Sequence, residues 1–272
     1  GAYRVRHLAI ENTLVVTNRM PAGLNRGYGG PQFYFALERL MEIAARGLAA
    51  FDGTKWVSPG ANFSVNAAIN SMVEFDDGSG PALFVAGSFN SVSGTIVNSV
   101  AKRSGGAWQP VGSGFITLPA FPQSSGTVYA LAVHDDGNGA KLYAGGSFAA
   151  SGATAIQNIA VWNGSTWSAV GGGITGQVYA LKSFSGELWA GGSFSAAGGN
   201  PATSLARWNG ATWSTVDANV GGAPKYINAL HVHDDGGGAD LYATGRFTSI
   251  DGVPAASIAS YDGLTWSALG LG

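Results

Sequence analysis

The stretch Leu142-Tyr-Ala-Gly-Gly-Ser-Phe148 decides the fold, together with the apolar run that starts at Ile159 and the tryptophan eight residues later, Trp167. The first part recurs at residues 83–89, 188–194 and 241–247, each time 25 residues before a Trp. The second part occurs five times, and each copy joins a small apolar strand through Asn-Gly, Asp-Gly or Gly-Gly to a Trp. These copies end on Trp56, Trp108, Trp167, Trp213 and Trp266. The chain from residue 48 onward is therefore a repeat array.

The length of the repeat predicts its architecture. Successive Trp residues lie 52, 59, 46 and 53 positions apart, and periods near ~50 residues with strand-like patterns are typical of propeller blades rather than helical solenoids. Four strands fit into each unit. We therefore expect an all-β propeller with four full four-stranded blades and one partial blade. The expected bounds are 48–60 for the partial blade and 65–113, 127–172, 177–217 and 226–270 for the full ones.

The motif residues have physical roles in such an array. Gly145 and Gly146 let neighbouring backbones approach where a side chain would clash. Phe148 and Trp167 are expected to fill the wedge between adjacent blades, so we interpret the repeated Trp residues as structural rather than ligand-binding. The Asn163-Gly turn is typical of a tight hairpin, although two further residues before Trp167 indicate a slightly longer loop.

Composition limits the classes of function. Only 11% of the 272 residues are charged, and the 43 Gly and 11% aromatic residues favour short strands with tight turns. Residues 48–272 carry eight Lys/Arg against thirteen Asp/Glu, which argues against nucleic acid as a partner. No apolar run is long enough to span a membrane. With no Cys, disulfides and thiolate metal sites are excluded.

The array resembles kelch-type propeller repeats in its Gly-Gly after a strand, its aromatic residue with Asn/Asp-Gly, and its Trp. Residues 75–89 are also similar to repeat arrays in large secreted bacterial proteins. The resemblance implies a β-propeller that is extracellular and acts as a scaffold or binding module. We expect the array to be cut from a longer one, because the partial blade has no partner strands at the other end of the sequence.

Residues 1–47 follow a different pattern and carry a net charge of +3, from six Arg and three Glu. A strand-like run, a Gly-rich loop and a helical pattern follow one another, and a glycine loop before a helix can bind an anion. The segments Thr17–Pro21, Arg26–Gln32 and Phe35–Met41 resemble the molybdopterin-binding large subunit of the molybdenum hydroxylases, the xanthine dehydrogenase, aldehyde oxidase and carbon monoxide dehydrogenase family.

That resemblance implies a set of cofactor-binding residues. They are Arg26, Gly27, Tyr28, Gly29, Gly30 and Gln32. It implies that Arg26 lies near the oxygen ligands of the metal and that Tyr28 takes the place of an aromatic residue that packs on the substrate. The family's catalytic Glu lies near the far end of a much longer subunit, and the only Glu residues after the join are Glu74 and Glu187, both within the array. The alternative function is thus a truncated or chimeric molybdopterin-dependent oxidoreductase, inactive alone.

Acidic turns are the other candidate sites. Three units contain Asp-Asp-Gly turns, and their carboxylates suit Ca²⁺. These residues are Asp76, Asp77, Asp135, Asp136, Asp234 and Asp235. They lack the longer series of carboxylates and the closing Glu of an EF-hand loop, so turn formation is the preferred interpretation. His231 and His233 could share a face as metal ligands. His134 and Phe75 occupy the position of His233 in other units, which indicates a planar ring there instead.

The favoured hypothesis is a non-enzymatic propeller that binds through its variable loops. These loops are residues 90–98, 149–158, 195–204 and 248–257, and they occupy the same point of each unit. Their small, Ser/Thr-rich composition suits a polar ligand, a glycan or a protein. No carboxylate pair for glycoside cleavage stands out, and Asp217, Asp240 and Asp251 stay unassigned. The sequence has no nucleophile elbow, phosphate loop or zinc signature. The propeller resemblance implies an extracellular location, and the molybdenum hydroxylase resemblance implies a cytoplasmic one.

Overall fold

The computed structural model describes residues 50–51, 56–57, 61–64, 67–117, 124–215 and 220–269, and only the backbone for the first two ranges. Within these residues every regular element is a β-strand; four large antiparallel sheets share one order of four strands, and the remaining sheets are two-stranded hairpins. The prediction of an all-β fold with four four-stranded units is confirmed. The hairpin of β1 (Ala50–Phe51) and β2 (Trp56–Val57) precedes them, with Phe51 opposite Trp56. The expected strand, loop and helix of residues 1–47 lie outside the described residues.

Each sheet takes its four main strands from one continuous stretch of chain. The first sheet consists of β3 (Ala68–Asp76), β4 (Pro81–Ser88), β7 (Val100–Ser104) and β8 (Ala107–Pro110). The second consists of β9 (Thr127–Asp135), β10 (Ala140–Ser147), β13 (Ile159–Trp162) and β14 (Trp167–Ala169). The third consists of β15 (Ile174–Phe184), β16 (Glu187–Ala197), β18 (Leu205–Trp208) and β19 (Trp213–Thr215), with β17 (Asn200–Pro201) paired to β16. The fourth consists of β20 (Tyr226–Asp234), β21 (Ala239–Arg246), β24 (Ile258–Tyr261) and β25 (Trp266–Ala268).

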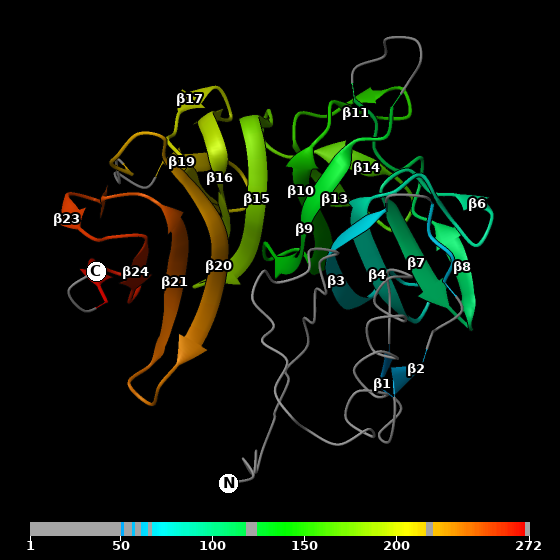
Figure 1. Cartoon of the computed structure of the whole chain (residues 1–272), viewed down its shortest axis with the longest axis horizontal. Helices are drawn as coiled ribbons and strands as arrows, with labels where there is room; N and C mark the ends of the chain where they lie inside the picture. Colours follow the sequence, from blue (N-terminus) through cyan, green and yellow to red (C-terminus); the bar gives the residue numbers. More distant parts are fainter. Residues whose placement is uncertain are drawn as a thin grey trace, which may run out of the picture.

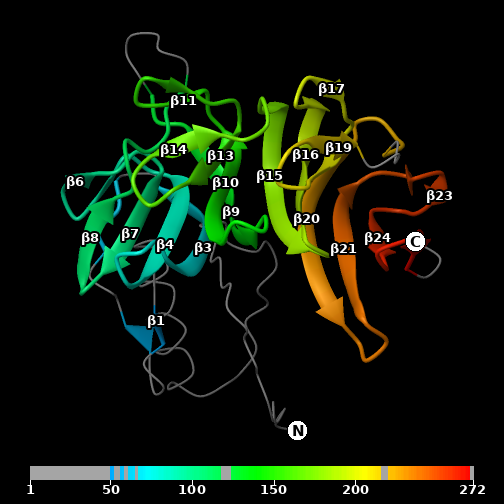
Figure 2. The ribbon, with the colours of Figure 1, turned by 180° about the vertical axis from the view of Figure 1, so that it is seen from behind.

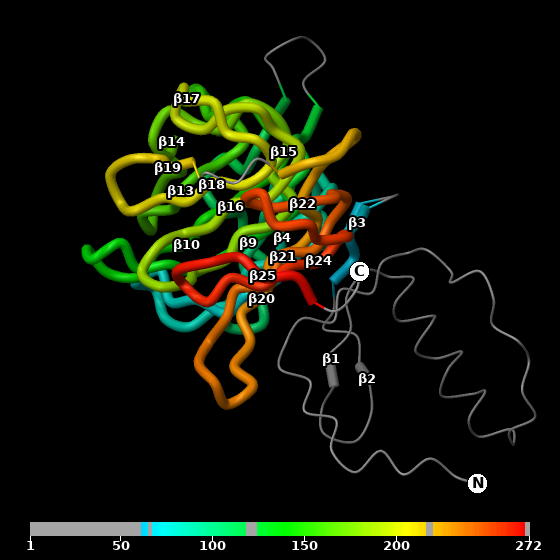
Figure 3. Tube along the Cα trace, turned by 90° about the vertical axis from the view of Figure 1, so that its left-hand side faces the viewer, coloured from blue at the N-terminus to red at the C-terminus, as the bar shows by residue number. Residues whose placement is uncertain are grey.

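The sheets follow one another in chain order, from cyan through green and yellow to red (Figure 1), and the view from behind shows the same order (Figure 2). Their first strands are neighbours in the sequence β3, β9, β15, β20. In the side view the sheets overlap one behind another (Figure 3). We refer to β3, β9, β15 and β20 as the inner strands, since each is an edge of its sheet that faces the next inner strand.

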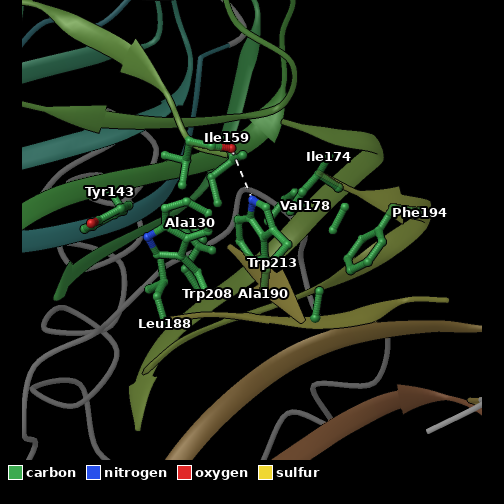
Figure 4. Close-up of a cluster of buried hydrophobic side chains, with 14 of the residues drawn as sticks. Ala130, Tyr143, Ile159, Ile174, Val178, Leu188, Ala190, Phe194, Trp208 and Trp213 are labelled. Carbon is green, nitrogen blue, oxygen red and sulfur yellow. Dashed lines mark hydrogen bonds between the residues drawn. The ribbon is translucent and has the colours of Figure 1, made fainter. Parts of the chain in front are cut away.

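The hydrophobic core lies between sheets rather than within one. Three clusters of buried side chains join the first sheet to the second, the second to the third, and the third to the fourth. In the middle cluster, Tyr143 and Ile159 of the second sheet pack with Val178, Trp208 and Trp213 of the third (Figure 4). Both faces of an internal sheet are therefore buried, which explains the weak alternation of its strands.

The glycine pair sets how closely the sheets approach. A Cβ on Gly145 would lie 2.6 Å from Cγ1 of Val178 in the next sheet, and one on Gly191 would lie 2.6 Å from Cγ2 of Ile227. The second glycine of each pair faces its own inner strand, where a Cβ on Gly146 would overlap the carbonyl oxygen of Thr127. The first glycine therefore permits packing between sheets, and the second permits pairing within one.

The repeated Trp ties the second and third sheets to the segment that precedes each of them. The Nε1–H of Trp167 donates to the carbonyl oxygen of Val111 at 3.0 Å, and that of Trp213 donates to Val170 at 3.1 Å. Phe148 stacks on Phe115, with ring centroids 4.2 Å apart. The predicted wedge of Phe and Trp between blades is present, and for Trp167 and Trp213 its polar edge is satisfied by a backbone acceptor.

Candidate ligand-binding surface

The four variable loops form the same structure at the same end of every sheet. Each contains a two-residue hairpin: β5 (Ser91–Val92) with β6 (Thr95–Ile96), β11 (Ala150–Ser151) with β12 (Thr154–Ala155), the end of β16 with β17, and β22 (Ser249–Ile250) with β23 (Val253–Pro254). Each loop begins at the end of the second strand of its sheet, beside the first residues of the inner strand. In the second sheet, for example, Ser147 at the end of β10 pairs with Thr127 at the start of β9. We call this the loop end of the array.

The base of each loop is tied to the segment that connects two sheets. Ala150 forms a bridge with Ile116, and Ser249 forms one with Gly221. Phe63 forms the corresponding bridge with Val92 in the first unit. The hairpin tips are exposed, whereas the bases share backbone hydrogen bonds with the scaffold. The loops thus present variable tips on a fixed support, as binding loops commonly do.

One further position joins the loops of the first three sheets to the next sheet, and sequence analysis did not find it. Asn158 donates from Nδ2 to the carbonyl oxygen of Ile174 at 2.9 Å, and Ser204 donates from Oγ to that of Lys225 at 3.3 Å. Ser99 donates in the same way to Gly126. All three have positive φ, at 61°, 64° and 73°, where Asn and short polar residues are tolerated best. The signal in the sequence was a single small polar residue before the third strand of each unit.

Tyrosines of three neighbouring inner strands meet near the loop end. The rings of Tyr129 and Tyr179 lie edge to face with centroids 5.3 Å apart, and those of Tyr179 and Tyr226 do so at 6.3 Å. All three side chains are half-buried. Burial and the two neighbouring phenols raise the pKa of Tyr179. We call these three residues the tyrosine row.

The Asp-Asp-Gly turns lie at the opposite end of the sheets, the turn end. Oδ1 of Asp76 accepts hydrogen bonds from the backbone N–H groups of Gly78 and Gly80, both at 2.9 Å. Asp135 and Asp234 form the same pair of bonds in their own turns. The first carboxylate of each turn is therefore occupied by the turn itself.

The second Asp of the turn links neighbouring sheets in the first unit. Asp77 accepts from Lys102 Nζ at 2.9 Å and from Trp162 Nε1 of the second sheet at 3.2 Å. Burial would raise the pKa of Asp77, but these bonds and one from Ser79 outweigh it and hold the pKa below its usual value. Asp136 pairs with Lys141 at 3.0 Å, while Asp235 is exposed. Calcium at these turns stays a prediction.

The planar-ring position before these turns is present in all four sheets. Phe75, His134, Phe184 and His233 each pack against an aromatic residue of the second strand, at 6.0, 5.8, 6.5 and 6.2 Å between ring centroids. His134 is 2% exposed and its Nδ1 lies 2.8 Å from Oγ of Ser183 in the third sheet. His231 and His233 are exposed on the fourth sheet. In the described part of the chain, no three His, Asp or Glu side chains are grouped as metal ligands.

Replacing His134 with phenylalanine is expected to reduce the loss of stability at acidic pH. Burial lowers the pKa of His134 from its ordinary value of 6.5. The stabilisation that the neutral His134 ring gives to the folded state is therefore complete above that pH. It is lost as the pH falls, because the unfolded chain then binds a proton on this ring more readily than the folded chain does. Urea unfolding between about pH 7 and pH 5 measures this. The variant should lose less stability than the parent over this range, and equal losses would contradict the assignment.

Among the described residues, the two Glu of the array do not belong to a further cluster of acidic or His side chains. Glu187 pairs with Arg207 at 3.1 Å, and Glu74 is exposed on β3. Burial, with the neighbouring Asp136, raises the pKa of Tyr143 to about 12, so this phenol stays neutral at ordinary pH. The predicted molybdopterin residues Arg26, Gly27, Tyr28, Gly29, Gly30 and Gln32 lie outside the described residues.

Comparison with known families identifies the array. The family model of the Rax2 C-terminal beta propeller domain matches residues 116–271. The chain belongs to the Rax2 C-terminal beta propeller domain family. The Rax2 propeller match begins in the segment before β9 and covers the second, third and fourth sheets. It supports the propeller in general, with nothing specific to kelch repeats.

A second family model, that of a molybdopterin cofactor-binding domain, matches residues 1–50. This match and the Rax2 propeller match fall on separate parts of the chain, as the change of pattern near residue 48 predicts. No curated protein matches the chain. In the described residues there is no helix long and apolar enough to cross a membrane.

Proposed function

We propose that the chain is a non-enzymatic β-propeller scaffold that binds a polar ligand, a glycan or a protein, at its loop end. The observation that carries the proposal is the set of four equivalent hairpins with exposed tips of variable sequence. Three of their bases are held by bridges to the preceding segments, and the base of the loop 195–204 is held by the pairing of Ile174 with Ala197. In an array with buried internal faces, the tips are the surface that is free to change. A secreted location and membership of a larger protein rest on the resemblance to secreted repeat arrays.

Charged substitutions at the loop tips test this proposal. Thr154→Arg and Asn200→Arg each place a bulky cation on an exposed tip. The probe is an array of immobilised neutral and acidic glycans together with purified extracellular matrix proteins. A ligand found there should bind about tenfold more weakly to the tip variants, as expected when a central contact is lost.

The matched control is Ser165→Arg, an exposed residue in the hairpin at the turn end. It should leave the affinity within about twofold. Binding at the loop end would be contradicted if the chain binds none of the probes, or if only the turn-end variant binds its ligand more weakly.

A second candidate function is favoured by the molybdopterin family match to residues 1–50. On this alternative the chain carries part of an oxidoreductase of the molybdenum hydroxylase type. The match covers the Arg26–Gln32 loop, while most of the chain belongs to the propeller. We therefore place the function in the propeller and treat residues 1–47 as a segment joined to it.

A further inference from the structure

The tyrosine row coincides with an irregularity that recurs in every sheet. The pairing of each inner strand with the second strand shifts by one residue near the loop end. The residue left without a partner in the ladder is Asn70, Tyr129, Tyr179 or Asn228. Such bulges redirect a side chain and are enriched beside functional sites. Two of the three tyrosines are therefore placed by a feature of the scaffold.

The bulge positions and those two residues earlier are chemically uniform. All eight side chains are uncharged, and seven of them carry an amide or a hydroxyl group that can form hydrogen bonds. The residues are Ala68, Asn70, Thr127, Tyr129, Gln177, Tyr179, Tyr226 and Asn228. Within this set the hydroxyl of Tyr179 donates to Oε1 of Gln177 at 2.6 Å, which leaves the amide N–H groups of Gln177 as donors. These eight positions thus combine the half-buried rings of the tyrosine row with neutral donors and acceptors.

We infer that the tyrosine row is a binding site for a neutral oligosaccharide at the loop end of the propeller. A sugar ring presents apolar C–H faces together with hydroxyl groups, and the row offers aromatic faces beside amides and hydroxyls. None of the eight side chains carries a charge that would pair with a charged ligand. A proline-rich peptide would also dock on aromatic rings, and its unpaired carbonyl groups could accept from the amides, so the experiment below includes such a peptide as a competing ligand. The inference rests on the proposed binding function and names the ligand class.

The first inner strand, β3, indicates where the site ends. Asn70 uses its amide to donate to the carbonyl oxygen of Val128 at 2.8 Å, so this position serves the contact between the first two sheets. Asn228 at the equivalent position is exposed. The site therefore extends over Tyr129, Tyr179 and Tyr226, from the second sheet to the fourth.

Binding of neutral hexasaccharides to the whole chain tests the inference. Isothermal titration would use cellohexaose, laminarihexaose and mannohexaose, with an acidic hexagalacturonate and a proline-rich peptide as other probes. At least one neutral hexasaccharide should bind. Tyr179→Ala should weaken that binding about tenfold or more, because the central ring contacts both neighbours. Tyr179→Phe should retain most of it, since the ring remains.

Tyr242→Ala is the matched control, because Tyr242 is also half-buried but belongs to β21 and packs on His233. It should change the affinity by less than about twofold. Thermal unfolding of each variant shows whether it is folded. If Tyr179→Ala is not, the affinity of the separate variant Tyr129→Ala tests the same contact, and Tyr179→Phe shows the affinity of a chain that keeps all three rings. No binding of any neutral hexasaccharide, or binding indifferent to Tyr179 and Tyr129, overturns the inference. Binding of a protein ligand that only the loop-tip variants weaken would overturn it while supporting the proposed function.

Discussion

Gly192→Ala is expected to lower the free energy of unfolding by about 3 kcal/mol, because the added Cβ would overlap the carbonyl oxygen of Gln177 on the paired inner strand. That oxygen belongs to backbone held in the sheet, so it has little freedom to move away. The equivalent glycines Gly87, Gly146 and Gly245 face backbone carbonyls in the same way. Urea unfolding of the variant and the parent at neutral pH measures the difference.

Gly237→Ala is the matched control for this substitution. Gly237 lies in an exposed turn, and the only neighbour of an added Cβ would be Oδ1 of Asp235 at 3.3 Å. The change there should stay within about 0.5 kcal/mol, as expected for exposed positions. Similar stabilities for the two alanine variants would mean that the glycine pair does not set the strand pairing.

Trp213→Ala is expected to cost about 3 to 5 kcal/mol, the usual range for removal of a buried Trp side chain. The side chain is 6% exposed, packs in the cluster between the second and third sheets, and donates to Val170. Trp108 holds the same position in the first sheet but is half-buried. Trp108→Ala should therefore be milder by half or more. Equal losses in chemical unfolding would contradict the assignment of the repeated Trp to the contact between sheets.

The sequence predicted well the features that repeat with constant spacing. The interval from Leu142 to Trp167 recurs in each full unit and corresponds to the distance from the second strand to the last. The role of Gly145 followed from its place directly after an apolar strand, and the structure adds Val178 as the neighbour that excludes a Cβ. The ring position of His134 was found in the same way, from Phe75 at the equivalent point.

Contacts between residues that do not occupy equivalent positions in different units were not predicted. Tyr226 lies two positions before the bulge residue of its strand, whereas Tyr129 and Tyr179 are bulge residues, so the three tyrosines do not align in the repeat. They meet only because neighbouring inner strands lie side by side. Ser204 was missed for a related reason, since its partner Lys225 belongs to the next connecting segment. Spacing within a unit carries no information about such pairs.

The measurement that tests the central claim most directly is the molybdenum content of the full chain, purified from a host that makes molybdopterin and read by elemental analysis. The account places the function in the propeller and predicts far less than one molybdenum atom per chain. About one atom per chain, lost when Arg26 is replaced by alanine, would contradict it and assign the function to the N-terminal segment.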